Sequence, residues 1–318
     1  MRYRPKITVI GLCGKSVFMT VDHFHQEGET VHADTIYVEP GGKGYNQAVA
    51  AARLGADVTF ISCCGMDDGA DLCEQFLVKE GVKPMIHRIP DEATPFATIL
   101  TDREGRNRVT VYSGAAQKMT EDMIAQDKAV IEDSDVILLN FEYPNEINYA
   151  ALRIAEESGV CAILNPAPAK KVSSDFLQRF HVTTPNQTEV LAYPGMNGEQ
   201  TPSEIANALY KNGYTNTVVT LGGDGVLTVE DTMIRHYDAI KCDAVDTTGA
   251  GDTFNGALAV AVAEGKTLKD AVVFAQNAAS LSVRKHCVMP SIPTRAEVCS
   301  SFVEINPRRL SRVGDISV

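Results

Sequence analysis

The chain has 318 residues, of which 44% are hydrophobic and 22% charged, and this globular composition excludes a disordered polymer. Its 29 basic and 41 acidic residues give a formal net charge of −12, which argues against a sequence-independent grip on nucleic acid or on an anionic membrane. We therefore expect no nucleic-acid partner and no membrane partner, and any phosphate group must be held locally.

The cysteines and the apolar runs predict a cytoplasmic location. Eight cysteines are scattered along the chain without the paired spacing of a zinc site, so they are expected to be reduced residues, mostly of the core. No stretch approaches the roughly 20 apolar residues of a membrane span, and no apolar segment of signal-peptide length follows the N-terminus.

Short apolar runs alternate with alanine-rich segments of helical period along most of the chain. The expected strands are residues 7–10, 58–62, 136–140, 162–164, 182–183 and 217–221. Expected helices include residues 47–54 and 253–264, the latter ended by Gly265. This alternation predicts an α/β fold with a mostly parallel sheet covered by helices on both faces, a three-layer sandwich.

Two stretches, residues 17–40 and 95–112, depart from this rhythm. In the second, residues 97–101 and 108–112 flank a turn at residues 102–106. Strands without a crossover helix predict a small second sheet that acts as a lid, or as an edge that pairs with another subunit, and the alternative is a set of surface hairpins. We expect one domain over residues 1–306 and a loose tail over residues 307–318.

The strongest chemical motif covers residues 246–256 and leads directly into an expected helix. Small residues open this helix, so the N–H groups of Gly249, Ala250 and Gly251 are available to cradle a phosphoryl group. A carboxylate beside an anion site is unfavourable unless it accepts a proton from an attacking hydroxyl, which is the role that we predict for Asp252. The alternative is an ordinary helix N-cap at Asp252.

Two weaker motifs carry polar groups suited to the same chemistry. Gly41 and Gly42 precede Lys43 and Asn46, and this glycine turn lets the backbone approach a ligand while two side chains donate to hydroxyl groups. Further along, an amide and a carboxylate in the segment 186–189 are spaced to hold the waters of a magnesium ion. Alone, the first is a bare glycine turn and the second a capping arrangement.

Two further patterns are interpreted as coincidental. The segment 11–16 ends in Gly-Lys-Ser after a strand, but it has two residues between its glycines where a phosphate-cradling P-loop needs four. His23, His25 and His32 lie close together in the expected lid, and without a carboxylate or cysteine to complete a ligand set they are interpreted as exposed histidines.

Together, the motifs resemble those of the ribokinase-like (PfkB) family of carbohydrate kinases, from about residue 7 to residue 293. Further matching segments are residues 165–168, 184–189 and 220–225, and the first signature, beginning at Gly41, is most similar to that of the ribokinase branch. The resemblance implies a ribokinase-like αβα sandwich with a small β-sheet lid. It also implies ATP-dependent phosphorylation of a sugar hydroxyl, on D-ribose or a related pentose. The alternatives are a deoxy sugar, fructose or a nucleoside as acceptor, or a catalytically silent ligand sensor.

The resemblance also implies roles for individual residues. Asp252 is the catalytic base, beside the anion hole of Gly249, Ala250 and Gly251. The sugar-binding residues are Gly42, Lys43, Asn46, Glu142 and Asp252. The ATP-binding residues are Asn186, Thr220, Gly222, Gly225 and, near the adenine, Asn277. Glu189 and Asn186 hold Mg²⁺ through water. A monovalent cation, expected to be K⁺, is held by Asp246, Thr248, Ser282, Lys285, Cys287 and Ser291. A homodimer through the lid is expected.

One departure from the family bears on the acceptor. Members that act on ribose have an asparagine and an aspartate at the positions of Gly14 and Ser16, and the aspartate grips two hydroxyls of the ring. A charged hydrogen bond is worth about 1.5–3 kcal/mol, so its loss weakens ribose by roughly one to two powers of ten. We hypothesise that Lys15 replaces part of this grip and favours a charged or differently hydroxylated substrate.

Overall fold

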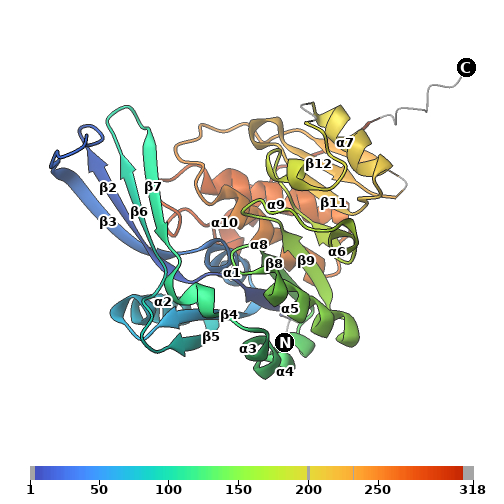
Figure 1. Cartoon of the computed structure of the whole chain (residues 1–318). Helices are drawn as coiled ribbons and strands as arrows, with labels where there is room; N and C mark the ends of the chain where they lie inside the picture. Colours follow the sequence, from blue (N-terminus) through green and yellow to red (C-terminus); the bar gives the residue numbers. More distant parts are fainter. Residues whose placement is uncertain (1–3, 199–200, 232, 311–318) are drawn as a thin grey trace, which may run out of the picture.

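The computed structural model describes residues 4–198, 201–231 and 233–310, which form a large sheet between two layers of helices and a smaller sheet at one side (Figure 1). In spatial order, the large sheet contains β14 (Arg308–Arg309), β13 (Ile234–Tyr237), β12 (Val226–Val229), β11 (Thr217–Thr220), β10 (Val182–Thr183), β9 (Cys161–Asn165), β8 (Val136–Asn140), β1 (Lys6–Ile10), β4 (Asp57–Gly65) and β5 (Val82–Ile89). The strands from β11 to β5 are parallel and the last three at the other edge are antiparallel. The predicted mostly parallel sheet is confirmed.

Both faces of the large sheet are buried, because side chains alternate along its strands. In β8, Val136 and Leu138 belong to one core cluster while Ile137 and Leu139 belong to the other. The first cluster is covered by α1 (Lys43–Arg53), α2 (Asp68–Lys79), α8 (Ala250–Ala263), α9 (Leu268–Ser282) and α10 (Arg295–Ser300). The second is covered by α3 (Glu121–Gln126), α4 (Lys128–Glu132), α5 (Asn145–Ser158), α6 (Ser174–Gln178) and α7 (Pro202–Lys211). Three single-turn helices complete the elements: η1 (Gly114–Lys118), η2 (Glu189–Ala192) and η3 (Gly222–Asp224).

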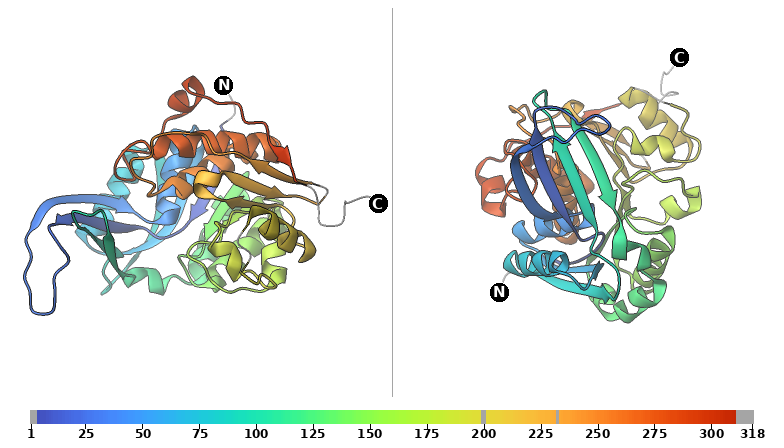
Figure 2. Two further views of the ribbon diagram at one scale, coloured as in Figure 1. Left: turned by 90° about the horizontal axis from the view of Figure 1, so that it is seen from above. Right: turned by 60° about the vertical axis from the view of Figure 1, so that its left-hand side comes forward.

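The smaller sheet projects from one side of the sandwich and is called the lid (Figure 2). It contains β3 (Ala33–Gly41), β2 (Gly14–Val21), β6 (Phe96–Thr101) and β7 (Asn107–Tyr112), in that order. The turn between β6 and β7 is stabilised by the buried Asp102, whose Oδ1 accepts the N–H groups of Glu104 and Arg106 at 3.0 Å each. The expected separate sheet is confirmed, and its first strand begins at Gly14, earlier than the sequence indicated.

The C-terminal segment differs from the sequence-based expectation. Residues 308–309 form β14, which pairs with β13, and the guanidinium of Arg308 forms an ion pair with Asp238. The expected loose tail therefore does not begin at residue 307, and residues 311–318 of that expectation lie outside the described part of the chain.

Two further sequence features can be compared with the structure. Four of the eight cysteines are buried, Cys299 is exposed, and all of them are free thiols. Among the described residues, no helix combines the length and apolarity needed to cross a bilayer.

Candidate active site

The first turns of α1 and α8 bring the two glycine motifs together around Asp252. The Asp252 side chain is 7% exposed. Its Oδ2 accepts a hydrogen bond from Asn46 Nδ2 at 2.8 Å, and its Oδ1 accepts one from Gln47 Nε2 at 3.2 Å. The N-cap of α8 is Gly249, with φ of 77°, and no side chain of a described residue caps this helix. Asp252 is therefore not an N-cap residue, and the capping alternative is wrong.

The charge on Asp252 is controlled by burial and by Lys43. Burial raises the pKa of Asp252 above its ordinary value, while the Lys43 ammonium and the amides of Asn46 and Gln47 act in the opposite direction. The same carboxylate raises the pKa of Lys43, so this amine stays protonated. Lys43 and the two amides offset only part of the effect of burial, so the Asp252 carboxylate is a stronger base than an aspartate in water.

Two amide oxygens beside Asp252 have no partner. Asn46 Oδ1 and Gln47 Oε1 are buried and make no hydrogen bond within the described part of the chain. An unpaired buried acceptor costs about 1–3 kcal/mol, and a hydroxyl group of a ligand removes this cost because it donates a hydrogen bond. The acceptor side of the site is thus suited to a molecule with several hydroxyls. Gln47 was missed in the sequence, although it follows Asn46 directly on the helix that the glycine turn begins.

Glu142 fixes the glycine turn that begins α1. Its Oε1 accepts the N–H of Lys43 at 2.7 Å, and its Oε2 accepts the N–H groups of Gly44 and Leu12 at 2.9 Å each. The turn passes so close to the end of β1 that a Cβ on Gly44 would lie 2.7 Å from the Cα of Gly11. These bonds support a positioning role for Glu142, and its contact with a sugar stays a prediction.

The expected anion hole lies at the N-terminal end of α8, whose residues Ala250, Gly251 and Phe254 line a large cleft. Gly251 is in the first turn, where N–H groups have no partner within the helix. Apart from its chain neighbours and its own helix backbone, no described residue has an atom within 4 Å of the position that a Cβ on Gly251 would occupy. The N–H of Ala250 already bonds to the carbonyl of Thr247 at 3.2 Å. A Cβ on Gly249 would lie 2.6 Å from Val288 Cγ1, so only glycine fits here.

A cleft of about 1200 Å³ extends from this helix end over the antiparallel edge of the large sheet. Among the predicted ATP-binding residues, it brings together Asn186, Thr220, Gly222 and Gly225. Asn277 does not line the cleft. It is 2% exposed, and its side chain bonds to the backbone of Val273 and Val303. The prediction of a direct contact between Asn277 and adenine is not supported, because all its polar atoms face the protein. From the same helix, Gln276, Ala279, Ser280 and Val283 line the cleft instead.

Asn186 and Glu189 form a reciprocal turn at the end of this cleft. Glu189 Oε2 accepts the N–H of Asn186 at 2.9 Å, and Asn186 Oδ1 accepts the N–H of Glu189 at 2.8 Å. Burial raises the pKa of Glu189, and Lys43 lowers it. One carboxylate oxygen is left for a further ligand, and oxygen ligands suit Mg²⁺, which retains several waters in such sites. The capping arrangement is therefore present, and it is compatible with a water-mediated magnesium site.

The expected cation loop packs against the C-terminal end of α9. Asp246 connects its two halves, since Oδ1 accepts the N–H of Thr248 at 2.9 Å and Oδ2 accepts that of Cys287 at 3.2 Å. Ser291 Oγ donates to the carbonyl of Val288 at 2.8 Å, so its lone pairs are not used in that bond and can bind a cation. Ser282 Oγ donates to the carbonyl of Ala279 in the preceding turn of α9. The available donors are oxygens, which suit a hard cation. Lys285 forms an ion pair with Glu297, so only its backbone carbonyl fits the predicted role.

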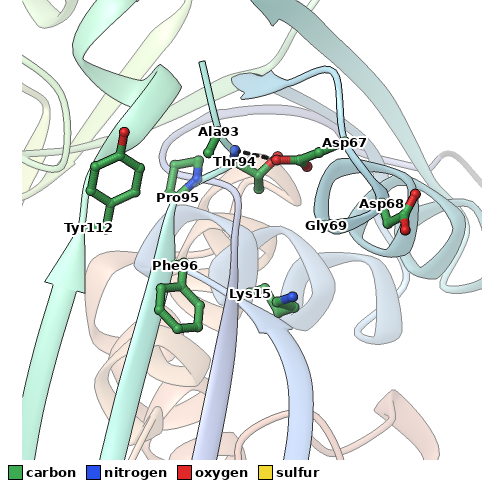
Figure 3. A pocket seen from close by; sticks show the side chains of 9 residues that line it. All are labelled: Lys15, Asp67, Asp68, Gly69, Ala93, Thr94, Pro95, Phe96 and Tyr112. Atoms are coloured by element: carbon green, nitrogen blue, oxygen red, sulfur yellow. Dashed lines mark hydrogen bonds between the residues drawn. The ribbon is translucent and has the colours of Figure 1, made fainter. Parts of the chain in front are cut away.

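Lys15 does not face this site. Ser16 Oγ lies 3.4 Å from the position that a Cβ on Gly41 would occupy, and this position is 3.9 Å from Asn46 Oδ1. Ser16 is therefore on the side of β2 that faces Asn46 and the expected sugar site, which we call the acceptor side. Because side chains alternate along a strand, Lys15 is on the other side. There it lines a separate pocket of about 460 Å³ with Asp68, Phe96 and Tyr112 (Figure 3). The hypothesis that Lys15 contacts the substrate is wrong.

The two patterns interpreted as coincidental have structural explanations. Gly14, Lys15 and Ser16 begin strand β2, whereas a P-loop requires a helix at that point. In the lid, His23 Nε2 is bonded to Glu29 Oε1 at 2.9 Å, and the exposed ring is close to Asp22 as well. Within the described ranges, no three histidine, cysteine or acidic side chains are grouped in a way that could hold a metal ion.

Comparison with known proteins finds relatives that span nearly the whole chain. The model of the pfkB family carbohydrate kinases matches residues 4–295. The chain is 36% identical over 297 residues to a ribokinase of Haemophilus influenzae, covering 92% of this chain and 97% of the relative. A solved structure of ribokinase from Thermotoga maritima has a TM-score of 0.84 at 36% identity, covering 94% and 99% of the two chains. The structure of Arabidopsis thaliana ribokinase complexed with ribose and ATP has a TM-score of 0.88 at 29% identity, covering 94% and 98%.

Proposed function

Because the chain belongs to the pfkB family of carbohydrate kinases, we propose that it transfers the γ-phosphoryl group of ATP to a hydroxyl of D-ribose. It is a phosphotransferase that acts on a sugar hydroxyl. The observation that carries the proposal is the buried Asp252 carboxylate in the first turn of α8. Beside it, two amide oxygens on α1 have no partner among the described residues and can accept hydrogen bonds from the hydroxyls of a substrate. The choice of D-ribose is supported by relatives named ribokinase, one of which was solved in complex with ribose and ATP.

The mechanism follows from the placement of Asp252. An aspartate, even with a raised pKa, is too weak a base to ionise an alcohol before attack. Asp252 therefore positions the hydroxyl and accepts its proton late, as the oxygen–phosphorus bond forms. The amides at the start of α8 stabilise the charge on the transferring group, and Lys43 adds a positive charge beside the carboxylate. Alignment and charge stabilisation supply most of the reduction in the barrier.

We assign the metal ions by the fit of their donor sets. Glu189 and Asn186 would hold Mg²⁺ through water, and this ion would neutralise charge on the nucleotide phosphates. Asp246, Thr248 and Ser291, with the carbonyls of Ser282, Lys285 and Cys287, would hold K⁺. The contribution of these residues is to connect the segment before α8 to the segment after α9, so that the anion hole is rigid.

We further propose a homodimer through the lid. Val109, Val111 and Ile36 are 55%, 61% and 67% exposed on its strands, and exposed apolar sheet surface favours association with another chain. The use of ATP and the free cysteines support a cytoplasmic location. A second candidate acceptor is a deoxy sugar, which is favoured by one observation: Gly14 and Ser16 provide no carboxylate to grip two ring hydroxyls.

The test is an assay of ADP release with a panel of acceptors: D-ribose, other pentoses, 2-deoxyribose, fructose and nucleosides, each with and without K⁺. We expect the highest kcat/KM with ribose or its deoxy form, and stimulation by K⁺. Absence of ADP release above background with every acceptor would favour a silent ligand sensor and contradict the proposal.

A further inference from the structure

A buried carboxylate on the lid connects it to the wall of the anion hole. Glu39 lies on β3 two residues before the end of that strand and is 3% exposed. Its Oε1 accepts the N–H of Val288 at 3.2 Å, and its Oε2 accepts the N–H of Met289 at 3.2 Å. These residues are 249 and 250 positions away in the sequence, so the bonds join the lid to the segment after α9.

Val288 packs against Gly249, the first residue of the expected anion hole. Its side chain occupies the space that a Cβ on Gly249 would need, and Gly249 is the N-cap of α8. The neighbouring Cys287 has a φ of 63°, and its N–H is bonded to Asp246. The position of Val288 is therefore set on one side by Asp246 and on the other by Glu39.

The segment is also held at its carbonyl groups. Arg53 Nη1, from α1, donates to the carbonyl of Met289 at 2.6 Å and to that of Ile292 at 2.8 Å. Arg53 holds the end of the segment that lies away from Gly249, whereas Glu39 holds the residue that touches it. Among these anchors, Glu39 is the one that comes from the lid.

We propose that Glu39 is a positioning residue: through Val288 it fixes the start of α8 in the orientation that stabilises the transferring phosphoryl group, and it ties this orientation to the base of the lid. The inference rests on the proposed function. Glu39 contacts no reacting atom, so its loss should lower kcat and leave KM for the acceptor and for ATP nearly unchanged, as for an interaction that matters only in the transition state. Glu39 accepts two N–H groups with a carboxylate, and Glu39→Gln weakens these bonds. We therefore expect Glu39→Gln to lower kcat about tenfold.

Asp102→Asn provides a matched control. Asp102 is also a buried lid carboxylate that accepts two backbone N–H groups, but both belong to its own hairpin turn. We expect Glu39→Gln to lower kcat about tenfold and Asp102→Asn to leave it within about twofold. Equal losses in the two variants, or an unchanged kcat in Glu39→Gln, would overturn the proposal.

Val288→Ala tests whether the effect passes through the residue that touches Gly249. If Glu39 acts through Val288, the double variant should lose little more kcat than the worse single variant, because the two changes are coupled. Additive losses would contradict this route. Thermal unfolding of each variant shows whether the fold is retained.

Hydrogen exchange of the free protein provides a test that does not depend on catalysis. In Glu39→Gln we expect faster exchange of the amides of residues 249–251 as well as those of residues 287–289. Faster exchange at residues 287–289 alone would show a local anchor and would overturn the proposal. If the wild-type protein phosphorylates none of the acceptors tested, the proposed function fails while this measurement still decides the link between Glu39 and the start of α8.

Discussion

The acceptor side of β2 offers a gain-of-function test, because a carboxylate can be restored at Ser16. In Ser16→Asp, the new carboxylate would lie on the side of Gly41 and Asn46, where the hydroxyls of the acceptor are expected. A charged hydrogen bond to a hydroxyl contributes about 1.5–3 kcal/mol. Ser16 is paired with Glu39 across the strands, and like charges directly opposite cost about 0.2–1 kcal/mol.

The favourable contribution is the larger of the two, so binding of ribose should improve. We expect the KM for D-ribose to fall by roughly two- to a hundredfold in Ser16→Asp, with a smaller gain for 2-deoxyribose, which has one hydroxyl fewer. Initial rates of ADP release give KM and kcat, and calorimetry with ribose alone gives the dissociation constant without nucleotide.

Two controls separate charge from position. Ser16→Asn has nearly the size of the aspartate without its charge, and should recover less of the affinity. Lys15→Ala changes the neighbouring residue, which lines the pocket on the other side of the sheet, and should leave the preference among acceptors unchanged. An unchanged KM for ribose in Ser16→Asp, or a changed acceptor preference in Lys15→Ala, would refute this reasoning about the two sides of β2.

Three variants test the catalytic carboxylate and its surroundings. Asp252→Asn should lower kcat by about 10²–10⁴-fold with little change in the dissociation constant for ATP, as measured by calorimetry. Burial raises the pKa of Asp252, so its charged form lowers the free energy of unfolding at pH above that pKa. Asp252→Asn should therefore have a higher Tm than the wild-type protein at pH 8, and this difference should shrink as the pH falls. Lys43→Met removes the charge that opposes this shift, and the acid limb of the pH profile of kcat/KM should therefore move to higher pH; a limb that stays in place or moves down would contradict the assignment. Gly249→Ala forces a Cβ against Val288 and should lower kcat at least tenfold while ADP still binds, which equilibrium dialysis can check.

The sequence predicted the fold and the centre of the site because both depend on local signals. Apolar alternation identified β1, β4, β8 and β9, which are buried on both faces, and glycine-initiated helices identified Asp252 and Asn46. The strands β12 and β13 were missed because they form an antiparallel hairpin at the edge of the sheet, outside the alternation of strands and helices that identified the parallel strands.

Side-chain direction could not be obtained from the sequence. Lys15 was assigned to the acceptor from its position beside Ser16, yet neighbouring strand residues face opposite sides of a sheet. Asn277 was assigned to adenine, but the chain returns over α9 at Val303, and its backbone takes up all the polar atoms of that side chain. Glu39 gave no signal at all, because its partners are about 250 positions away.

The crossing of Gly11 and Gly44 has a consequence for interpreting mutational scans. A Cβ on either residue would lie 2.7 Å from the Cα of the other, so substitution of either glycine forces the two backbone segments apart. In a library scored for growth on an acceptor sugar, both positions would register as intolerant even though no ligand contact is needed to explain it. Intolerance at such a pair reports the spacing of two backbones, and a list of substrate contacts drawn from the scan alone would include them wrongly.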